Sequence, residues 1–193
     1  MNNQVRCVAA LCLALIVSRA AISQDKAKEN ELPKGFRGEF LMQLIDDEKK
    51  LIDLAGAIPE AKYGWRPEAG VRSISEVYVH IAASNYGFPK MMGVKPPENL
   101  ERDPEKKITA KKDVLDYMKR SFEYLKNVAM NTADADLDKP ASFFGEPTTV
   151  RGILFHLATH LHEHFGQSIA YARANEIVPP WTAAEMKQQD TKK

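Results

Sequence analysis

The chain has 193 residues, and its 27 lysines and arginines nearly balance its 26 aspartates and glutamates, giving a formal net charge of +1. This balance argues against the basic surface of a nucleic-acid-binding protein, because the lysines alternate with acidic residues as on a solvated helix face. We therefore expect no nucleic acid among its partners. The length suits one domain of ordinary size.

Residues 1–23 have the features of a secretory signal peptide. A basic opening ends at Arg6, residues 7–17 form an unbroken apolar run, and Ala21 and Ser23 are the small residues that precede a cleavage site. The run is too short for a membrane-spanning helix, which needs roughly 20 apolar residues. We predict cleavage after Ser23, no stable membrane insertion, and export to the periplasm or the medium.

Removal of this segment also limits the chemistry of the mature chain. Both cysteines, Cys7 and Cys12, lie in it, so neither a disulfide nor a thiol nucleophile is expected. Loss of Arg6 and Arg19 changes the formal net charge from +1 to −1. Residues 24–35 are charged and poor in apolar side chains, which predicts a flexible tether.

Two amphipathic helices are predicted in the first half of the mature chain. Over residues 36–58, apolar side chains recur at intervals of three, four or seven, and Pro59 ends the helix. Ser73 and Glu76 then have the spacing of a capping box, in which each side chain satisfies the other's backbone N–H. The second helix follows, with His80 on its inward apolar stripe.

A long connection separates the second helix from the third. Residues 92–108 contain three prolines and a glycine, too many helix breakers for a helix but a length that allows a crossover along a bundle. Thr109 is the expected cap of the third helix, which ends near residue 131. The second and third helices can therefore run parallel.

The fourth helix begins at Thr148 or Thr149 and runs to about residue 174. Residues 176–193 are expected to be loosely ordered. Four amphipathic helices without an alternating strand pattern or an internal repeat predict an all-α fold. We therefore predict a single four-helix bundle over residues 36–175.

Five histidines are the candidates for chemistry: His80, His156, His160, His162 and His164. At about 100° per residue, His160 and His164 lie about 40° apart on one helix face, and His156 lies about 40° to the other side of His160. His162 points about 200° away from His160 and is expected at the surface.

Three of these imidazoles can converge on one divalent metal ion. Residues four apart on a helix stand roughly 5–6 Å apart at Cβ, which allows His160 and His164 to share an ion. His80 is the only histidine elsewhere and supplies the third ligand, leaving one coordination position open. The alternative is a set of core histidines with ordinary hydrogen bonds, but several crowded imidazoles would then keep unsatisfied lone pairs.

Other metal motifs do not match the sequence. His162-Glu163 is followed by Gly166 where the zincin helix has its second histidine, which disfavours a metalloprotease. A di-iron bundle needs glutamate three residues before histidine on two helices, whereas Glu76 and His80 are four apart.

The motifs together resemble those of the DinB-like family, the damage-inducible, metal-binding four-helix-bundle proteins of bacteria. The resemblance covers nearly all of the mature chain and implies an up-down-down-up bundle with His80, His160 and His164 as metal ligands. The residues that carry it are Trp65-Arg66-Pro67, Val71-Arg72-Ser73-Ile74, His80, Thr149-Val150-Arg151-Gly152 and His160-Leu161-His162-Glu163-His164-Phe165-Gly166-Gln167.

Two further residues have weaker assignments under this resemblance. His156 has no ligand role in the family pattern and is interpreted as a neighbour of the ligands or a core residue. Gln167, close to one turn beyond His164, either hydrogen-bonds a ligand or bound water, or simply packs. Phe165 stands where many relatives have a basic residue, so any contact made by that base is absent here.

The metal predicted is zinc, although three imidazoles and water also suit nickel, iron or copper. Characterised branches of the family include thiol-dependent transferases and isomerases, but low-molecular-weight thiols are mainly cytoplasmic. Export therefore favours a metal-dependent hydrolase acting on an unknown small-molecule ligand. The alternatives are a non-enzymatic metal- or ligand-binding stress-response protein and a thiol-dependent S-transferase.

No catalytic base is identified from the sequence. Glu163 is expected to point away from the site together with His162, and Asn85 and Tyr86 are only plausible neighbours of the pocket. A homodimer is the default expectation for the oligomeric state.

Overall fold

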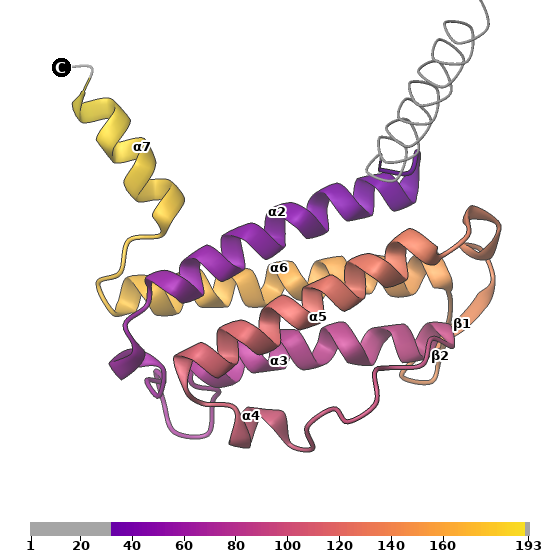
Figure 1. Cartoon of the computed structure of the whole chain (residues 1–193), viewed down its shortest axis with the longest axis horizontal. Helices are drawn as coiled ribbons and strands as arrows, with labels where there is room; N and C mark the ends of the chain where they lie inside the picture. Colours follow the sequence, from indigo (N-terminus) through magenta and orange to yellow (C-terminus); the bar gives the residue numbers. More distant parts are fainter. Residues whose placement is uncertain (1–31, 192–193) are drawn as a thin grey trace, which may run out of the picture. The chain divides into compact units, whose positions relative to one another are not determined.

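Four long helices surround a shared apolar core in the computed structural model, which describes residues 32–191 (Figure 1). The helices α2 and α6 run in one direction, and α3 and α5 run in the other. The order is thus up-down-down-up, and the predicted helical bundle is confirmed. The four helices are α2 (Phe36–Ala57), α3 (Ile74–Gly87), α5 (Lys111–Asn131) and α6 (Val150–Ala174).

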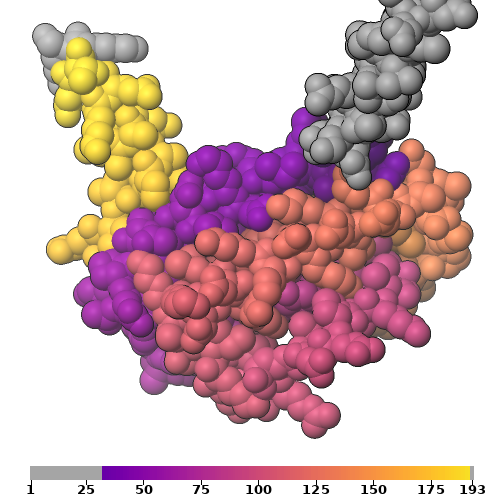
Figure 2. Space-filling model, viewed as in Figure 1, coloured from indigo at the N-terminus to yellow at the C-terminus, as the bar shows by residue number. Residues whose placement is uncertain are grey.

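The core lies where the apolar stripes of these helices meet. Each helix contributes side chains that are fully buried, and the core positions recur at helical spacing as the sequence predicted. Figure 2 shows one face of the molecule, on which α2, α5 and the connection between α3 and α5 lie at the surface. Representative core residues with no exposed area are Leu51, Ile81, Phe122 and Leu157.

Local hydrogen bonds fix where two of the long helices begin. The hydroxyl of Ser73 accepts from the backbone N–H of Glu76, and the Glu76 carboxylate accepts from the N–H of Ser73 at 2.7 Å, so the predicted capping box is present. At the start of α6, Thr149 Oγ1 accepts from the N–H of Gly152 at 3.1 Å.

The start of α5 corrects one expectation. Ala110, and not Thr109, occupies the capping position, and no side chain caps this helix. Thr109 lies one residue too early to reach the free N–H groups of the first turn. Lys111 instead links the two helices, since its ammonium donates to the carbonyl oxygens of Gly56 and Ile58 at the end of α2, both at 2.7 Å.

Short elements occupy the connections. The crossover from α3 to α5 contains α4 (Pro104–Lys107), and an antiparallel hairpin of β1 (Pro140–Phe143) and β2 (Glu146–Thr149) precedes α6. The sequence analysis predicted neither the helix nor the hairpin. Three 3₁₀ helices complete the connections: η1 (Glu60–Lys62), η2 (Phe88–Met92) and η3 (Asp134–Asp136).

The end of the described chain also differs from expectation. Residues 176–193 were predicted to be loosely ordered, but α7 (Pro180–Asp190) forms there. Trp181 meets the ring of Phe165 on α6 edge-on, with 5.5 Å between ring centroids, so an aromatic contact anchors α7 to the bundle.

The predicted signal peptide over residues 1–23 and most of the predicted tether over residues 24–35 lie outside the described residues. Within residues 32–191, no helix combines the length and the apolar character needed to cross a membrane.

Candidate metal centre

His80 on α3 and the pair His160 and His164 on α6 come together inside the bundle. The two helices lie antiparallel, so residues 80 positions apart in sequence face each other. The Nε2 atoms of His80 and His160 are 3.1 Å apart, and one ring nitrogen from each of the three residues lies within 4.8 Å of the others. All three side chains are partly buried.

A carboxylate from the crossover orients His80. Glu105 on α4 lies with Oε1 2.9 Å from Nδ1 of His80, while its Oε2 accepts from Arg72 at 2.8 Å. Because an ionised carboxylate only accepts, Nδ1 of His80 carries the proton and Nε2 presents its lone pair. This is the partner arrangement common for metal-bound histidines. The sequence analysis did not single out Glu105.

The side-chain amide of Gln167 orients His164 in the same way. Its Nδ1 lies 2.8 Å from Oε1 of Gln167, whose NH₂ group donates to the hydroxyl of Tyr171 at 3.1 Å. The amide oxygen thus accepts from Nδ1–H, which leaves the lone pair on Nε2 of His164. The rings of Trp65 and Tyr171 form a T-shaped pair with 5.3 Å between centroids, so the chain of contacts ends in an aromatic pair.

His160 is the least satisfied member of the group. Its Nδ1 is buried without a hydrogen-bond partner, and its Nε2 points at Nε2 of His80, with the hydroxyl of Ser84 at 3.5 Å. Burial, followed by the charges of His164 and His80, lowers the pKa of His160 to about 4. The imidazole is therefore neutral near pH 7.

These observations fit a bound cation. Two nitrogens that each lie about 2.0–2.1 Å from a tetrahedral zinc ion are about 3.3 Å apart, close to the 3.1 Å between His80 and His160. Without a cation, a proton on Nε2 of His160 could satisfy at most one of the lone pairs that His80 and His164 present, and the other would lack a partner in a partly buried space, which is unfavourable. The donor set present thus suits one divalent ion.

Electrostatics favour the neutral form of His80 and the ionised form of Glu105. Burial is the largest influence on His80 and lowers its pKa, although the hydrogen bond to Glu105 works in the opposite direction. For Glu105, burial opposes ionisation, but hydrogen bonds from Arg72 and His80 outweigh it and lower its pKa. The result is neutral histidine beside an ionised carboxylate at pH 7.

The remaining histidines lie outside the group. The side chain of His162 is 51% exposed, as its angular position predicted, and its Nε2 is 3.4 Å from Oδ2 of the buried Asp47. His156 stacks face to face on Phe143 of β1, with 4.0 Å between ring centroids and planes within 2° of parallel. It lies beside the site and is not part of the three-histidine cluster.

Glu163 departs from the sequence interpretation. It was expected to point away with His162, but it lines a cavity together with His80 and His160. Residue 163 follows His156 by seven positions, nearly two full turns, so both belong to the same helix face. The sequence analysis grouped Glu163 with its neighbour His162 and did not compare its angular position with that of His156.

The two expected pocket neighbours on α3 lie elsewhere. Asn85 is fully buried, and its amide donates to the hydroxyl of Ser121 on α5 at 3.1 Å. Tyr86 packs against the aromatic rings of Tyr117 and Tyr124, also on α5. Neither residue lines the cavity beside the histidines.

That cavity has a volume of about 360 Å³ and opens beside the histidine cluster. Its walls come from α3, η2, the hairpin and α6, and they combine aromatic rings with a few polar groups. The residues that line it are His80, Ser84, Phe88, Phe143, Phe144, His156, Thr159, His160 and Glu163.

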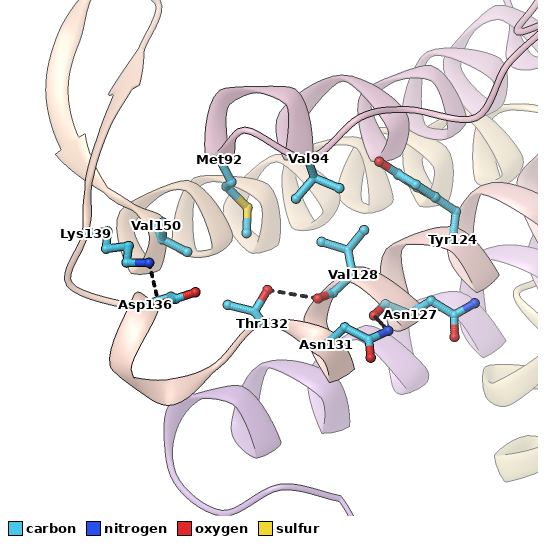
Figure 3. Close-up of a pocket in the computed structure, with 10 residues that line it drawn as sticks. All are labelled: Met92, Val94, Tyr124, Asn127, Val128, Asn131, Thr132, Asp136, Lys139 and Val150. Carbon is cyan, nitrogen blue, oxygen red and sulfur yellow. Dashed lines mark hydrogen bonds and ion pairs between the residues drawn. The ribbon is translucent and has the colours of Figure 1, made fainter.

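A second cavity of about 400 Å³ lies near the hairpin end of α5 and contains none of the histidines (Figure 3). Its polar side chains other than Asn127 bond to one another or to the backbone: Lys139 pairs with Asp136 at 2.7 Å, and the Asn131 amide and Thr132 hydroxyl donate to backbone carbonyls of α5. Because these groups already have partners, this cavity is a weaker candidate for chemistry.

Comparison with known proteins agrees with the fold. The sequence profile of the DinB superfamily matches residues 43–168. A DinB-like protein from Bacillus cereus is similar in structure, with a TM-score of 0.65 and 18% identity over 73% of this chain and 93% of that one. A DinB-like protein from Bacillus subtilis gives a TM-score of 0.59 and 18% identity over 72% and 94% of the two chains.

A four-helix bundle with three converging histidines is thus the class of protein that fold and site define. The chain belongs to the DinB superfamily, and the family resemblance seen in its sequence motifs is confirmed. The similarity to the two bacilli proteins concerns the fold alone. Among curated proteins, none matches the chain.

Proposed function

We propose that this protein binds one divalent metal ion, preferentially zinc, through His80, His160 and His164, and that it uses this ion to hydrolyse a small-molecule substrate after export. One observation carries the proposal: three ring nitrogens from two helices converge on one point, and hydrogen bonds to Glu105 and Gln167 fix the orientation of two of the rings. The prediction of export rests on residues 1–23 and is independent of the site.

The proposed ion and the protein make different contributions to hydrolysis. A divalent ion held by three neutral imidazoles is a Lewis acid that brings the pKa of coordinated water to about 7. The chain itself supplies the neutral ligands, since burial keeps the pKa of both His80 and His160 below the ordinary value. Ser84, 3.5 Å from Nε2 of His160, adds a hydroxyl beside the ligands.

Glu163 is the candidate proton acceptor. It is a carboxylate in the same cavity as His80 and His160, and it is exposed enough to exchange protons with solvent. A base within reach of the water to be activated contributes roughly 10²–10⁴-fold to hydrolysis. Glu163→Gln keeps the shape of the side chain and removes the base, so turnover should fall while metal content stays unchanged.

Metal content after purification from the native compartment tests the binding step. The wild-type chain should retain close to one zinc ion per molecule, and His160→Ala should lose it. His162→Ala is the matched control, because it removes an exposed imidazole from the same helix that lies outside the cluster. Equal metal content in both variants would contradict the assignment of the ligands.

Turnover on a panel of esters, amides and lactones tests the chemistry. Hydrolysis without added thiol that disappears in both His160→Ala and Glu163→Gln would support the hydrolase. Turnover that requires a thiol would instead identify a transferase. A metal-loaded, folded protein without turnover would identify a binding protein, the remaining alternative.

A further inference from the structure

The geometry points to a substrate class for this site: we propose that Phe88, Phe143 and Phe144 bind a flat apolar group, such as a phenyl ring, of a molecule whose oxygen donor reaches the metal. This inference rests on the proposed metal site. It goes further because it assigns a binding role to the hairpin, which contributes no metal ligand.

The aromatic wall is continuous with the histidine cluster. The ring centroids of Phe88 and His160 are 5.3 Å apart, and those of Phe88 and Phe143 are 5.6 Å apart. Phe143 also stacks on His156, which holds its ring against α6. Phe144 adds a third phenylalanine ring, with 4.8 Å between its centroid and that of Phe143 and a steep angle between the two planes. Such a wall offers both faces and edges to another ring.

The tip of the hairpin is built unusually. Phe143 pairs with Glu146, so the connection has two residues, Phe144 and Gly145, and their φ angles are +50° and +99°. A two-residue connection with both φ angles positive follows the type I′ pattern, which favours asparagine followed by glycine. Phenylalanine in the left-handed region is strained, and strain of this kind concentrates at functional sites.

The exposed side chain of Phe144 also supports a binding role. Phe144 is 77% exposed although it lines the cavity, so a large apolar surface faces water when the cavity contains no ligand. Turn propensity does not explain a phenylalanine here, and the edge-to-face contact with Phe143 still leaves most of its ring exposed. Contact with an apolar ligand would explain both the residue type and its position at the rim.

The charges of the cavity restrict the ligand further. Glu163 is the one charged side chain among the residues that line it, and no lysine or arginine is among them. The aromatic end of the ligand should therefore be neutral or cationic, while any anionic oxygen belongs at the metal. A cation would also be attracted to the ring faces.

Hydroxamates provide a direct test with a binding readout. Benzohydroxamate and acetohydroxamate carry the same metal-binding group and differ in a phenyl ring against a methyl group. Titration calorimetry on zinc-loaded protein should give at least about tenfold tighter binding of benzohydroxamate, which is the size expected for burying one ring in an aromatic site.

Phe144→Asn is the decisive variant. Asparagine suits the turn, so the melting temperature and the metal content should not fall, but the preference for benzohydroxamate should shrink severalfold. Phe155→Ala is the matched control, since Phe155 is an exposed aromatic residue of α6 that does not line the cavity. It should keep the full preference.

The outcomes separate the two proposals. Equal affinity for both hydroxamates in wild-type protein, or an unchanged preference in Phe144→Asn, would overturn the aromatic site while leaving the metal centre intact. A folded wild-type protein that binds neither zinc nor either hydroxamate would overturn the metal centre and, with it, this inference.

Discussion

Replacement of Glu105 by glutamine should weaken zinc binding about tenfold. Glu105 Oε1 accepts from Nδ1 of His80 at 2.9 Å and so fixes both the tautomer and the ring orientation of this ligand. Glutamine preserves the shape and one acceptor but removes the negative charge that raises the basicity of the ligand. Loss of such a partner typically costs about 10- to 100-fold in metal affinity.

The structure favours the lower end of that range. The side chain of Glu105 is 32% exposed, so solvent screens part of its charge. Arg72 works in the opposite direction: it donates to the same carboxylate at 2.8 Å, and without that partner its positive charge would repel the ion, so we expect the loss to reach about tenfold. A tenfold loss of affinity corresponds to about 1.4 kcal/mol.

The assay is competition with a chromophoric zinc chelator at pH 7.5. Glu101→Gln is the matched control, because Glu101 is also an acid of the crossover but pairs with Lys107 at 2.6 Å and does not contact His80. Its zinc affinity should stay within about twofold of wild type. An equal affinity of Glu105→Gln and Glu101→Gln, with both proteins folded, would refute the role given to Glu105.

Three predictions concern stability. Ser73→Ala removes the capping box with Glu76 and should lower the free energy of unfolding by about 1 kcal/mol in urea titrations. Gly152→Ala should cost about 1–3 kcal/mol in the same assay, because the new methyl group would overlap the Thr148 side chain; Gly64→Ala, with open space around it, should not pay this packing cost. The metal-free protein should lose stability as pH falls from about 6.5 to 4, because the unfolded chain takes up a proton that the pKa of about 4 denies to folded His160. This loss, on the order of 1 kcal/mol after solvent screening, should shrink in His160→Gln when pH-dependent melting is compared with wild type.

The sequence predicted the long helices because their signals are strong. Apolar residues at helical spacing extend over 14 residues or more in each helix, and the capping box at Ser73 marks the start of α3. The spacing of His160 and His164 and the inward position of His80 were enough to bring the three imidazoles together as a prediction. Each of these inferences depends on residues within one helix, where geometry is regular.

The short elements were missed because their signals are weak. The helix α4 has only four residues, fewer than the hydrophobic periodicity needs for detection. The hairpin has strands of four residues that contain Pro140 and Pro147, and its turn carries Phe144 where asparagine would have been recognised.

The partners of the site depend on tertiary structure. Glu105 lies 25 residues beyond His80 and reaches it only because the crossover folds back onto α3. Pro104 at the first helical position was the local signal for α4, since proline is favoured there. No pattern within the crossover indicates that the next residue faces a histidine.

An ion bound by the three histidines would link parts of the chain that are far apart in sequence. His80 and His160 lie 80 positions apart in the chain, and a bond through a shared ion would act as a reversible cross-link across this loop. The two cysteines of the sequence are Cys7 and Cys12, so no disulfide can close the loop between His80 and His160. Under the proposed function, the stability of the fold would then follow the zinc supply, with about 2.7 kcal/mol of added stability when free zinc is 100 times the dissociation constant.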